Sequence, residues 1–223
     1  LILFQELMHK GSNLIYDDSI KISKIIKNIG KSKSLKSFSI GSHKSDLHIL
    51  DHKYLKNEQV LTILFRKKKY KLMTSLIGKI QLNNLLMAML AASRIGIKFS
   101  NIVKSVNYIK PISGRLEKVG HLKNNSFVIL DYAHTPEALR SCLESLQDQF
   151  KLRKINLVFG CGGERDKQKR PIMGRIANKY CKKVYLTDDN PRTEDPKKIR
   201  NSIKKTIFKS KLFEISSREI AIK

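Results

Sequence analysis

The chain has 223 residues, a formal net charge of +26 and a hydrophobic content of 41%. That length is sufficient for one large domain or two modest ones. No run of eighteen apolar residues occurs, so we expect no membrane span. The first residues lack Met and have no basic region ahead of an apolar run. We therefore read them as the interior of a longer protein rather than as a signal peptide.

The strong positive charge raises the question of a nucleic-acid partner. The cations are mostly Lys and are scattered, and aromatic residues make up only 7% of the chain, so no base-stacking surface is apparent. Lys occurs together with abundant Ile and Asn, and a compositional bias is the simpler interpretation. The three cysteines are widely spaced without a CxxC pair, which argues against disulfides and zinc and favours a reducing cytoplasm.

Four segments in the first half of the chain have the patterns of regular structure. Isoleucines in residues 18–29 have the spacing of an amphipathic helix, and apolar runs broken by charges over residues 36–76 indicate β-hairpins. The strongest predicted helix covers residues 79–95, where five apolar side chains recur at helical spacing. A short helix is expected over residues 99–106.

Histidines and acids are concentrated in the hairpin region, at His43, Asp46, His48, Asp51 and His52. In a regular strand, Asp46, His48 and His52 would share one face. Structural metal sites need ligands from several elements. We therefore interpret these residues as solvated polar side chains on a strand and expect no metal site.

Pro111, Ser113 and Gly114 interrupt the pattern, and we place a domain boundary between residues 112 and 113. Strand-like and helix-like segments alternate after it. They are residues 126–131, 136–149, 154–159, 170–181, 183–187, 195–208, 211–215 and 216–222. Such alternation predicts βαβ units, a mostly parallel sheet and an α/β fold.

Glycines and cations follow the apolar run that ends at Phe159, in the sequence GCGGERDKQKRP. Because glycine has no Cβ, these glycines allow positive φ and let backbone amides approach an anion closely. We expect Pro171 to open the next helix. The following apolar run ends at Leu186 and leads into TDDNPR. Parallel strands bring both segments to one rim of the sheet, where open α/β sheets bind ligands.

Each of these two segments carries an Arg, Arg165 in the first and Arg192 in the second. Together with the acids between them they suit a zwitterion with two carboxylates and an amine, because guanidinium groups pair bidentately with carboxylates. For either segment alone, a glycine-rich turn with surface salt bridges is the better interpretation.

A third polar motif, DYAHTP, follows another apolar run. Asp131 lies where a strand would end and can accept hydrogen bonds from ribose hydroxyls, and Thr135 can cap a helix that begins with Pro136. A turn and a cap explain the same residues without a ligand. The side-chain amide of Asn84 has both a donor and an acceptor and could therefore bind the edge of an adenine. Arg115 lies at the domain boundary, where it could contact a phosphate. An exposed amide and an interdomain salt bridge are the alternatives.

Together these motifs resemble those of the Mur ligases. GKIQLNNLLMAMLAA and SGRLEKV extend the resemblance upstream, so that it covers nearly the whole chain and is strongest from Gly114 to Pro196. The DNPR form is associated with family members that add meso-diaminopimelate to UDP-N-acetylmuramoyl-L-alanyl-D-glutamate, whereas lysine-adding members vary its last position. The sequence departs from the family's motifs at two positions, where Gln81 replaces an Asn and Glu164 replaces the usual Asp.

The resemblance implies a fold and a reaction. Residues 1–112 would be the end of a central ATPase domain, and residues 113–223 a truncated Rossmann-like C-terminal domain that binds the amino acid. The reaction would be amide ligation through an acyl phosphate with ATP and Mg²⁺, in the cytoplasmic biosynthesis of peptidoglycan, which serves the cell wall, cell shape and cell division. A related ligase for L-lysine or another amino acid is one alternative, and a basic nucleic-acid-binding α/β protein is another.

The resemblance also implies site residues. Diaminopimelate would contact Arg165, Asp189, Asn190, Pro191 and Arg192. The nucleotide would contact Asn84, Arg115, Asp131 and His134. The GxxxxGK[ST] phosphate loop and the family's carbamylated Lys do not occur in this sequence. We therefore name no catalytic residue and expect the 223-residue chain alone to be inactive.

Overall fold

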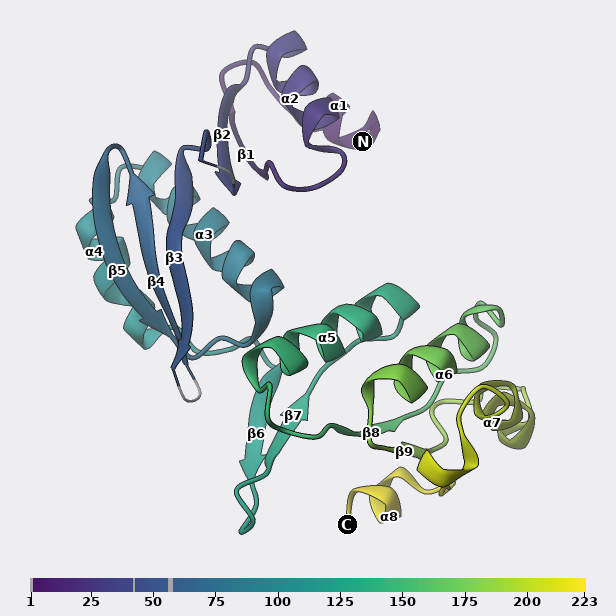
Figure 1. Ribbon diagram of the computed structural model, residues 1–223. Coiled ribbons are helices and arrows are strands. Elements are labelled where there is room, and N and C mark those ends of the chain that lie inside the picture. The colour runs from purple at the N-terminus through teal and green to yellow at the C-terminus, as the bar shows by residue number, and fades with distance from the viewer. Residues whose placement is uncertain (1, 42, 56–57) are drawn as a thin grey trace. The chain divides into compact units, whose positions relative to one another are not determined.

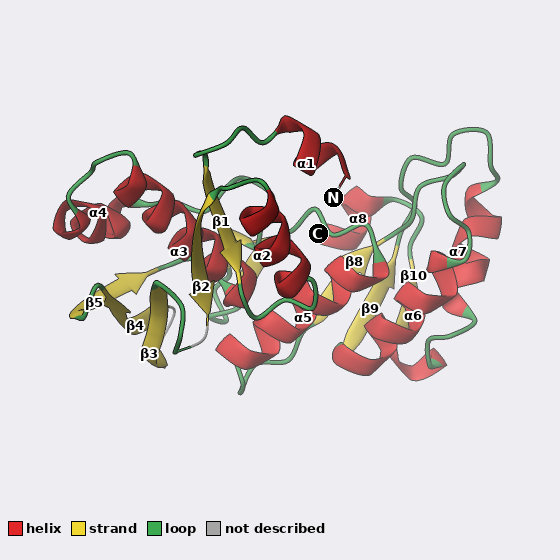
Figure 2. Ribbon diagram, turned by 90° about the horizontal axis from the view of Figure 1, so that it is seen from above, coloured by secondary structure: helices red, strands yellow, loops and turns green. Residues whose placement is uncertain are grey.

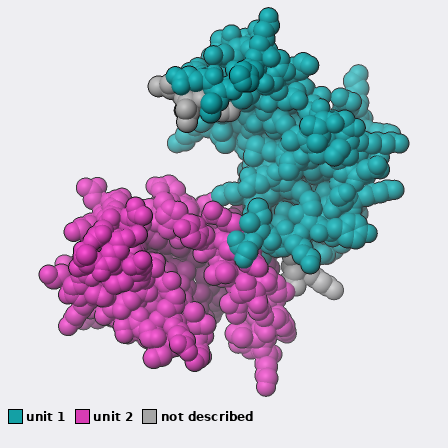
Figure 3. Space-filling model, turned by 180° about the vertical axis from the view of Figure 1, so that it is seen from behind, with its two compact units in different colours: residues 1–113 teal, residues 114–223 magenta. Residues whose placement is uncertain are grey.

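The computed structural model describes residues 2–41, 43–55 and 58–223 (Figure 1). The chain forms two compact units, Leu1–Ser113 (unit 1) and Gly114–Lys223 (unit 2), coloured separately in Figure 3. None of the helices in the described ranges combines the length and apolar composition needed to cross a membrane.

Unit 1 contains a five-stranded mixed sheet in the order β1-β2-β3-β4-β5. The strands are β1 (Asn13–Asp17), β2 (Lys36–Gly41), β3 (Leu47–Leu55), β4 (Glu58–Phe65) and β5 (Lys68–Thr74). The first three are parallel, and β3, β4 and β5 form an antiparallel meander. The hairpins expected from the sequence are therefore confirmed for β3–β5, whereas β1 was not expected.

Unit 1 also contains helices, and those that follow β1 pack against the sheet. The helices are α1 (Ile2–Leu7), α2 (Ser23–Ser32), α3 (Gly78–Arg94), α4 (Phe99–Ser105) and the 3₁₀ turn η1 (Val106–Tyr108). Helix α3 contacts β1 and β2, and its buried Leu82, Leu86 and Leu90 belong to one apolar cluster with Leu61 and Ile63 of β4. The two helices predicted over residues 79–95 and 99–106 are confirmed.

A β-bulge in β3 separates the histidines that were expected on one face. The register shifts between Ile49 and Asp51, so that His48 pairs with Leu64 and His52 pairs with Leu61. Because Leu61 and Leu64 are three positions apart, the two histidines lie on opposite faces. Within the described ranges, no three His, Cys, Asp or Glu residues are grouped so as to hold a metal ion.

Unit 2 is built on a parallel sheet in the order β10-β9-β8, labelled in Figure 2, and on an antiparallel pair of strands, labelled in Figure 1. The parallel strands are β8 (Asn156–Phe159), β9 (Lys183–Leu186) and β10 (Leu212–Glu214), and the pair is β6 (Glu117–His121) with β7 (Phe127–Leu130). The predicted α/β fold with a mostly parallel sheet is confirmed, although β6 was not expected.

The helices of unit 2 are α5 (Pro136–Gln149), α6 (Lys169–Tyr180), α7 (Pro196–Lys204), α8 (Arg218–Ile222) and the 3₁₀ turn η2 (Lys209–Lys211). Helix α6 packs against α5 and α7. The predicted cap of α5 is confirmed, because Thr135 Oγ1 accepts a hydrogen bond from the Ala138 amide at 3.2 Å. Pro171 does not open α6, which begins at Lys169, but it lies in the first turn, where an amide has no helical partner.

Candidate functional site

The three parallel strands of unit 2 end at the same level. Phe159 pairs with Leu186, and Leu186 pairs with Glu214, so the segments that follow these strands share one rim. Backbone hydrogen bonds continue past the strands, from Thr187 to Phe159 at 2.9 Å and from Asp188 to Ser216 at 3.0 Å. We call residues 160–168 the β8–α6 loop and residues 187–195 the β9–α7 loop.

The glycines of the β8–α6 loop serve a different purpose from the one expected. Gly160, Gly162 and Gly163 do not use the positive φ that glycine allows. A Cβ on Gly160 would lie 2.3 Å from the carbonyl oxygen of Thr187, and one on Gly163 would lie 1.9 Å from that of Pro191. Gly160 and Gly163 are therefore required, because the backbone of the β9–α7 loop packs directly against them.

Asn190 and Arg192 join the two loops. The Gly163 amide donates to the Asn190 carbonyl oxygen at 2.8 Å, and Arg192 Nη1 donates to the Gly163 carbonyl oxygen. The Asn190 side chain accepts from the Arg192 amide at 3.1 Å, and Arg192 has a φ of 51°. The Arg192 guanidinium is therefore positioned beside the glycines, with further N–H groups available for a ligand.

The other residues predicted to contact the amino acid lie on the same two loops. Arg165 is exposed and forms no hydrogen bond or ion pair with the part of the chain that the structure describes. Asp189 Oδ1 accepts from the Asn190 amide at 2.7 Å, and its Oδ2 lies 3.6 Å from Arg218 Nη2. Pro191 faces Gly163 with its carbonyl group. Cationic and anionic groups are thus presented together at the rim.

Sequence reasoning missed an ion pair that fastens the two loops to α6. Arg170 donates from Nη1 and Nη2 to the two carboxylate oxygens of Glu194 at 3.0 and 2.9 Å, and the Arg170 side chain is only 3% exposed. Glu194 also accepts from the Glu164 amide at 2.6 Å. The hydrogen bonds from Arg170 and from the Glu164 amide, with the nearby Lys167 charge, lower the pKa of Glu194 to about 2. No local pattern marks Glu194, because its partners are distant in sequence.

A second network holds the start of the β9–α7 loop. Arg200 Nε donates to Glu214 at 2.9 Å, Arg200 Nη1 donates to Asp188, and Lys204 donates to Glu214 at 2.9 Å. These hydrogen bonds raise the pKa of Arg200 and lower that of Glu214. Helix α7 is thereby tied to the ends of β9 and β10, which fixes the segment that carries Asp189.

The depressed pKa of Glu194 predicts a specific pH dependence of stability. The ionised carboxylate stabilises the fold at any pH above its usual pKa of 4.5, and this contribution is lost as the pH falls from there to about 2. We expect Glu194→Gln to lower the free energy of unfolding near neutral pH, and the difference from the parent protein to shrink between pH 4.5 and 2. Urea unfolding followed by circular dichroism measures this.

Asp148→Asn is the matched control, because it removes one exposed carboxylate from α5 that has no ion pair with the other described residues. A Glu194→Gln difference that stayed constant from neutral pH to pH 2 would show that the ion pair with Arg170 contributes no pH-dependent stability.

Three of the residues predicted to contact the nucleotide cluster in unit 2. Asp131 Oδ1 and Oδ2 accept from the amides of Ala133 and Leu116 at 2.9 and 2.8 Å. The Arg115 guanidinium lies over the Tyr132 ring, 5.3 Å from its centroid, and His134 Nδ1 lies 3.2 Å from the Tyr132 carbonyl oxygen. Asp131 thus organises the turn and still has carboxylate lone pairs for a ligand.

The fourth, Asn84, lies in unit 1. It is exposed on α3, whereas Gln81 on the same helix is buried. Of these two, only Asn84 presents its side chain to solvent.

Comparison with protein families matches both units. The Mur ligase middle domain model matches residues 1–92, and the Mur ligase glutamate ligase domain model matches residues 114–223. Curated relatives include the UDP-N-acetylmuramoyl-L-alanyl-D-glutamate--2,6-diaminopimelate ligase of Rickettsia felis, which is 38% identical over 220 residues. That alignment covers 98% of this chain and 40% of the relative. The ligase of the same name from Buchnera aphidicola is 44% identical over 151 residues, covering 67% of this chain and 30% of the relative.

Solved structures agree in fold. A UDP-N-acetylmuramoyl-L-alanyl-D-glutamate--2,6-diaminopimelate ligase superimposes with a TM-score of 0.66 and 28% identity, covering 95% of this chain and 44% of that one. Folylpolyglutamate synthase of Thermotoga maritima superimposes with a TM-score of 0.76 and 22% identity, covering 98% and 50% of the two chains. The chain spans less than half the length of the Rickettsia felis ligase and of the first solved ligase.

Proposed function

The chain belongs to the Mur ligase family, and from this membership we propose that the protein adds meso-diaminopimelate to UDP-N-acetylmuramoyl-L-alanyl-D-glutamate at the expense of ATP. The reaction would take place in the cytoplasm during peptidoglycan biosynthesis. Unit 1 would be part of the ATPase domain, and unit 2 would bring the amino acid. The names of the aligned ligases support this assignment along the whole chain.

The choice of meso-diaminopimelate as the amino acid rests on two loops that each carry an Arg and meet at one rim of the parallel sheet. The hydrogen bond between Gly163 and Asn190 holds the β8–α6 and β9–α7 loops together. Arg165 and Arg192 would each bind a carboxylate of diaminopimelate, because a guanidinium group matches a carboxylate with two parallel hydrogen bonds. Asp189 and the Asn190 side chain would receive an ammonium group, and Pro191 would shape the loop between them.

In the proposed reaction, the substrate carboxylate becomes an acyl phosphate and ADP is released. The amine of diaminopimelate then attacks the acyl carbon, the amide bond forms, and inorganic phosphate leaves with the oxygen that it carries. The residues of unit 2 contribute by positioning, since holding the amine at the correct distance and angle replaces a costly encounter in solution. The amine loses one proton as the amide forms, and this proton is released to the solvent.

Mg²⁺ belongs to the proposal as the counter-ion of the nucleotide phosphates. Over the residues that the structure describes, however, no cluster of three potential ligands could hold a metal ion. We name no side chain of this chain as a Mg²⁺ ligand and assign no step to one.

Asn84, Arg115, Asp131 and His134 are proposed to serve the nucleotide. In the full-length protein we expect Asp131→Ala to weaken ATP binding and to leave the affinity for diaminopimelate unchanged. Asp131→Asn tests the turn separately, since its amide can still accept one of the two backbone hydrogen bonds. Unchanged ATP affinity in Asp131→Ala, measured by calorimetry, would reduce Asp131 to a turn residue.

Calorimetric titration of the protein with meso-diaminopimelate, L-lysine and a short DNA duplex tests the proposed function. We expect meso-diaminopimelate to bind at least about tenfold more tightly than L-lysine, which lacks the second carboxylate and therefore one charge-assisted pair. Equal affinities would favour a ligase for another amino acid. Salt-sensitive DNA binding with no amino-acid binding would instead favour the nucleic-acid-binding alternative.

A further inference from the structure

Unit 1 contains a cavity of about 390 Å³ that the proposed ligase reaction does not use. It lies between β2, the start of β3, the β4–β5 turn and the end of α3. Its lining includes three cations, Arg66, Lys67 and Arg94, and one acid, Asp46. All of these residues belong to unit 1.

The cations of this cavity outnumber its one acid. Within residues 2–41, 43–55 and 58–223, no ion pair joins Arg66, Lys67 or Arg94 to an acid. Asp46 is partly committed elsewhere, because its Oδ2 accepts from the Ser39 amide at 2.8 Å. Three positive charges against one negative charge leave the lining with an excess of positive charge, which attracts anions.

Arg94 is held in an orientation that leaves a buried donor unused. Its guanidinium carbon lies 3.6 Å from the centroid of the Phe38 ring, which fixes the plane of the group. Its Nε is buried and has no hydrogen-bond partner among the described atoms. Burial and the charge of Arg66 lower the pKa of Arg94, and the charge of Asp46 opposes them. A buried N–H without an acceptor is unfavourable. Arg94 lines the cavity, and its terminal guanidinium N–H groups are the donors that it offers to an anion there.

Arg66 and Lys67 form the two-residue turn between β4 and β5. Both have left-handed backbone conformations, with φ of 48° and 62°, where such turns usually contain Asn or Gly. The turn places two positive charges together at the mouth of the cavity. Neither charge is needed by the turn, because uncharged Asn or Gly suits these φ values better. An anion bound between the two charges would offset their repulsion.

We propose that this cavity binds a small phosphate-bearing anion, with Arg94 at its wall and Arg66 and Lys67 at its mouth. Phosphate fits better than a single carboxylate because it carries nearly two negative charges at neutral pH and accepts several hydrogen bonds, including paired ones from a guanidinium group. The site lies in a different unit from the loops proposed to bind diaminopimelate.

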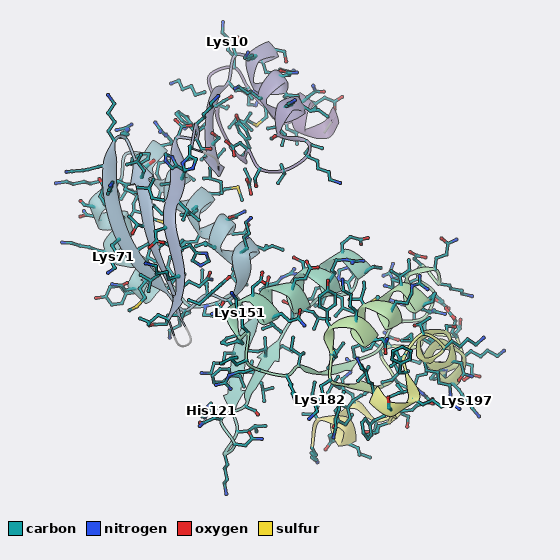
Figure 4. All side chains as sticks on the ribbon, in the orientation of Figure 1. Lys10, Lys71, His121, Lys151, Lys182 and Lys197 are labelled. Carbon is teal, nitrogen blue, oxygen red and sulfur yellow. The ribbon has the colours of Figure 1, made fainter. Side chains whose placement is uncertain are left out.

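Titration with inorganic phosphate and with pyrophosphate, followed by amide NMR shifts and calorimetry, tests this proposal. We expect pyrophosphate to shift the amides of residues 45, 66 and 67, and Arg94→Gln and Arg66→Gln each to weaken its binding about tenfold or more. Lys71→Gln is the matched control, because it removes one charge from the exposed face of β5 in the same unit (Figure 4). We expect it to change the affinity less than twofold.

Two outcomes would overturn the proposal. One is the absence of shifts at these amides at millimolar pyrophosphate. The other is equal weakening by Lys71→Gln and Arg66→Gln, which would show non-specific attraction by the positive surface. Arg66→Gln keeps the test valid if Arg94→Gln fails to fold. Arg66 is exposed, so the circular dichroism spectrum of this variant should match that of the parent protein.

Discussion

Replacing Arg192 by Ala is expected to weaken the affinity of the protein for meso-diaminopimelate by about ten- to a hundredfold, since losing a charge-assisted pair costs ~1.5–3 kcal/mol. The proposed site gives Arg192 two tasks. It would bind a ligand carboxylate, and it already donates to the Gly163 carbonyl oxygen. In the full-length ligase, the same variant should raise the KM for diaminopimelate far more than the KM for ATP.

Two further variants make this test specific. Arg192→Lys keeps the charge but not the planar fork, so we expect only partial recovery of affinity. Lys197→Ala removes a positive charge from the exposed start of α7, labelled in Figure 4, and should leave the affinity nearly unchanged. Equal changes in the KM values for diaminopimelate and ATP in Arg192→Ala would remove Arg192 from the amino-acid site.

Replacing Gly163 by Ala is expected to lower both the stability of unit 2 and its binding of diaminopimelate. The added Cβ would lie 1.9 Å from the carbonyl oxygen of Pro191, so the two loops must separate. Separation would break the hydrogen bond from Gly163 to Asn190, and overpacking of this kind typically costs about 1–3 kcal/mol. We expect a lower free energy of unfolding in urea, together with loss of diaminopimelate binding.

Gly162→Ala is the matched control for Gly163→Ala. A Cβ on Gly162 would meet Arg192 Nη1 and the Asn190 carbonyl oxygen at 3.4 Å, and the long Arg side chain can move by the small amount required. This variant should therefore be much less destabilised than Gly163→Ala. If both variants were equally stable, the close approach of the two loops in the structure would be incorrect.

Patterns that are local in sequence were sufficient for much of the fold. Apolar spacing located α3, the meander of β3–β5 and the alternation of strands and helices in unit 2. The cap of α5 by Thr135 was also predictable, because a cap involves residues only three positions apart. The family resemblance depended on motifs of the same kind, which are contiguous runs such as GCGGERDKQKRP and DDNPR.

Features that depend on distant partners became visible only in the tertiary structure. The bulge in β3 placed His48 and His52 on opposite faces, because a register shift depends on pairing with β4. Gly160 and Gly163 are explained by the carbonyl groups of another loop rather than by their own φ. The pairing of Arg170 with Glu194 joins residues far apart along the chain, so no periodicity could have indicated it. The sequence by itself determined which side chains are present at the rim of unit 2, and the close packing of two loops decided how they are held, since only folding brings their backbones into contact.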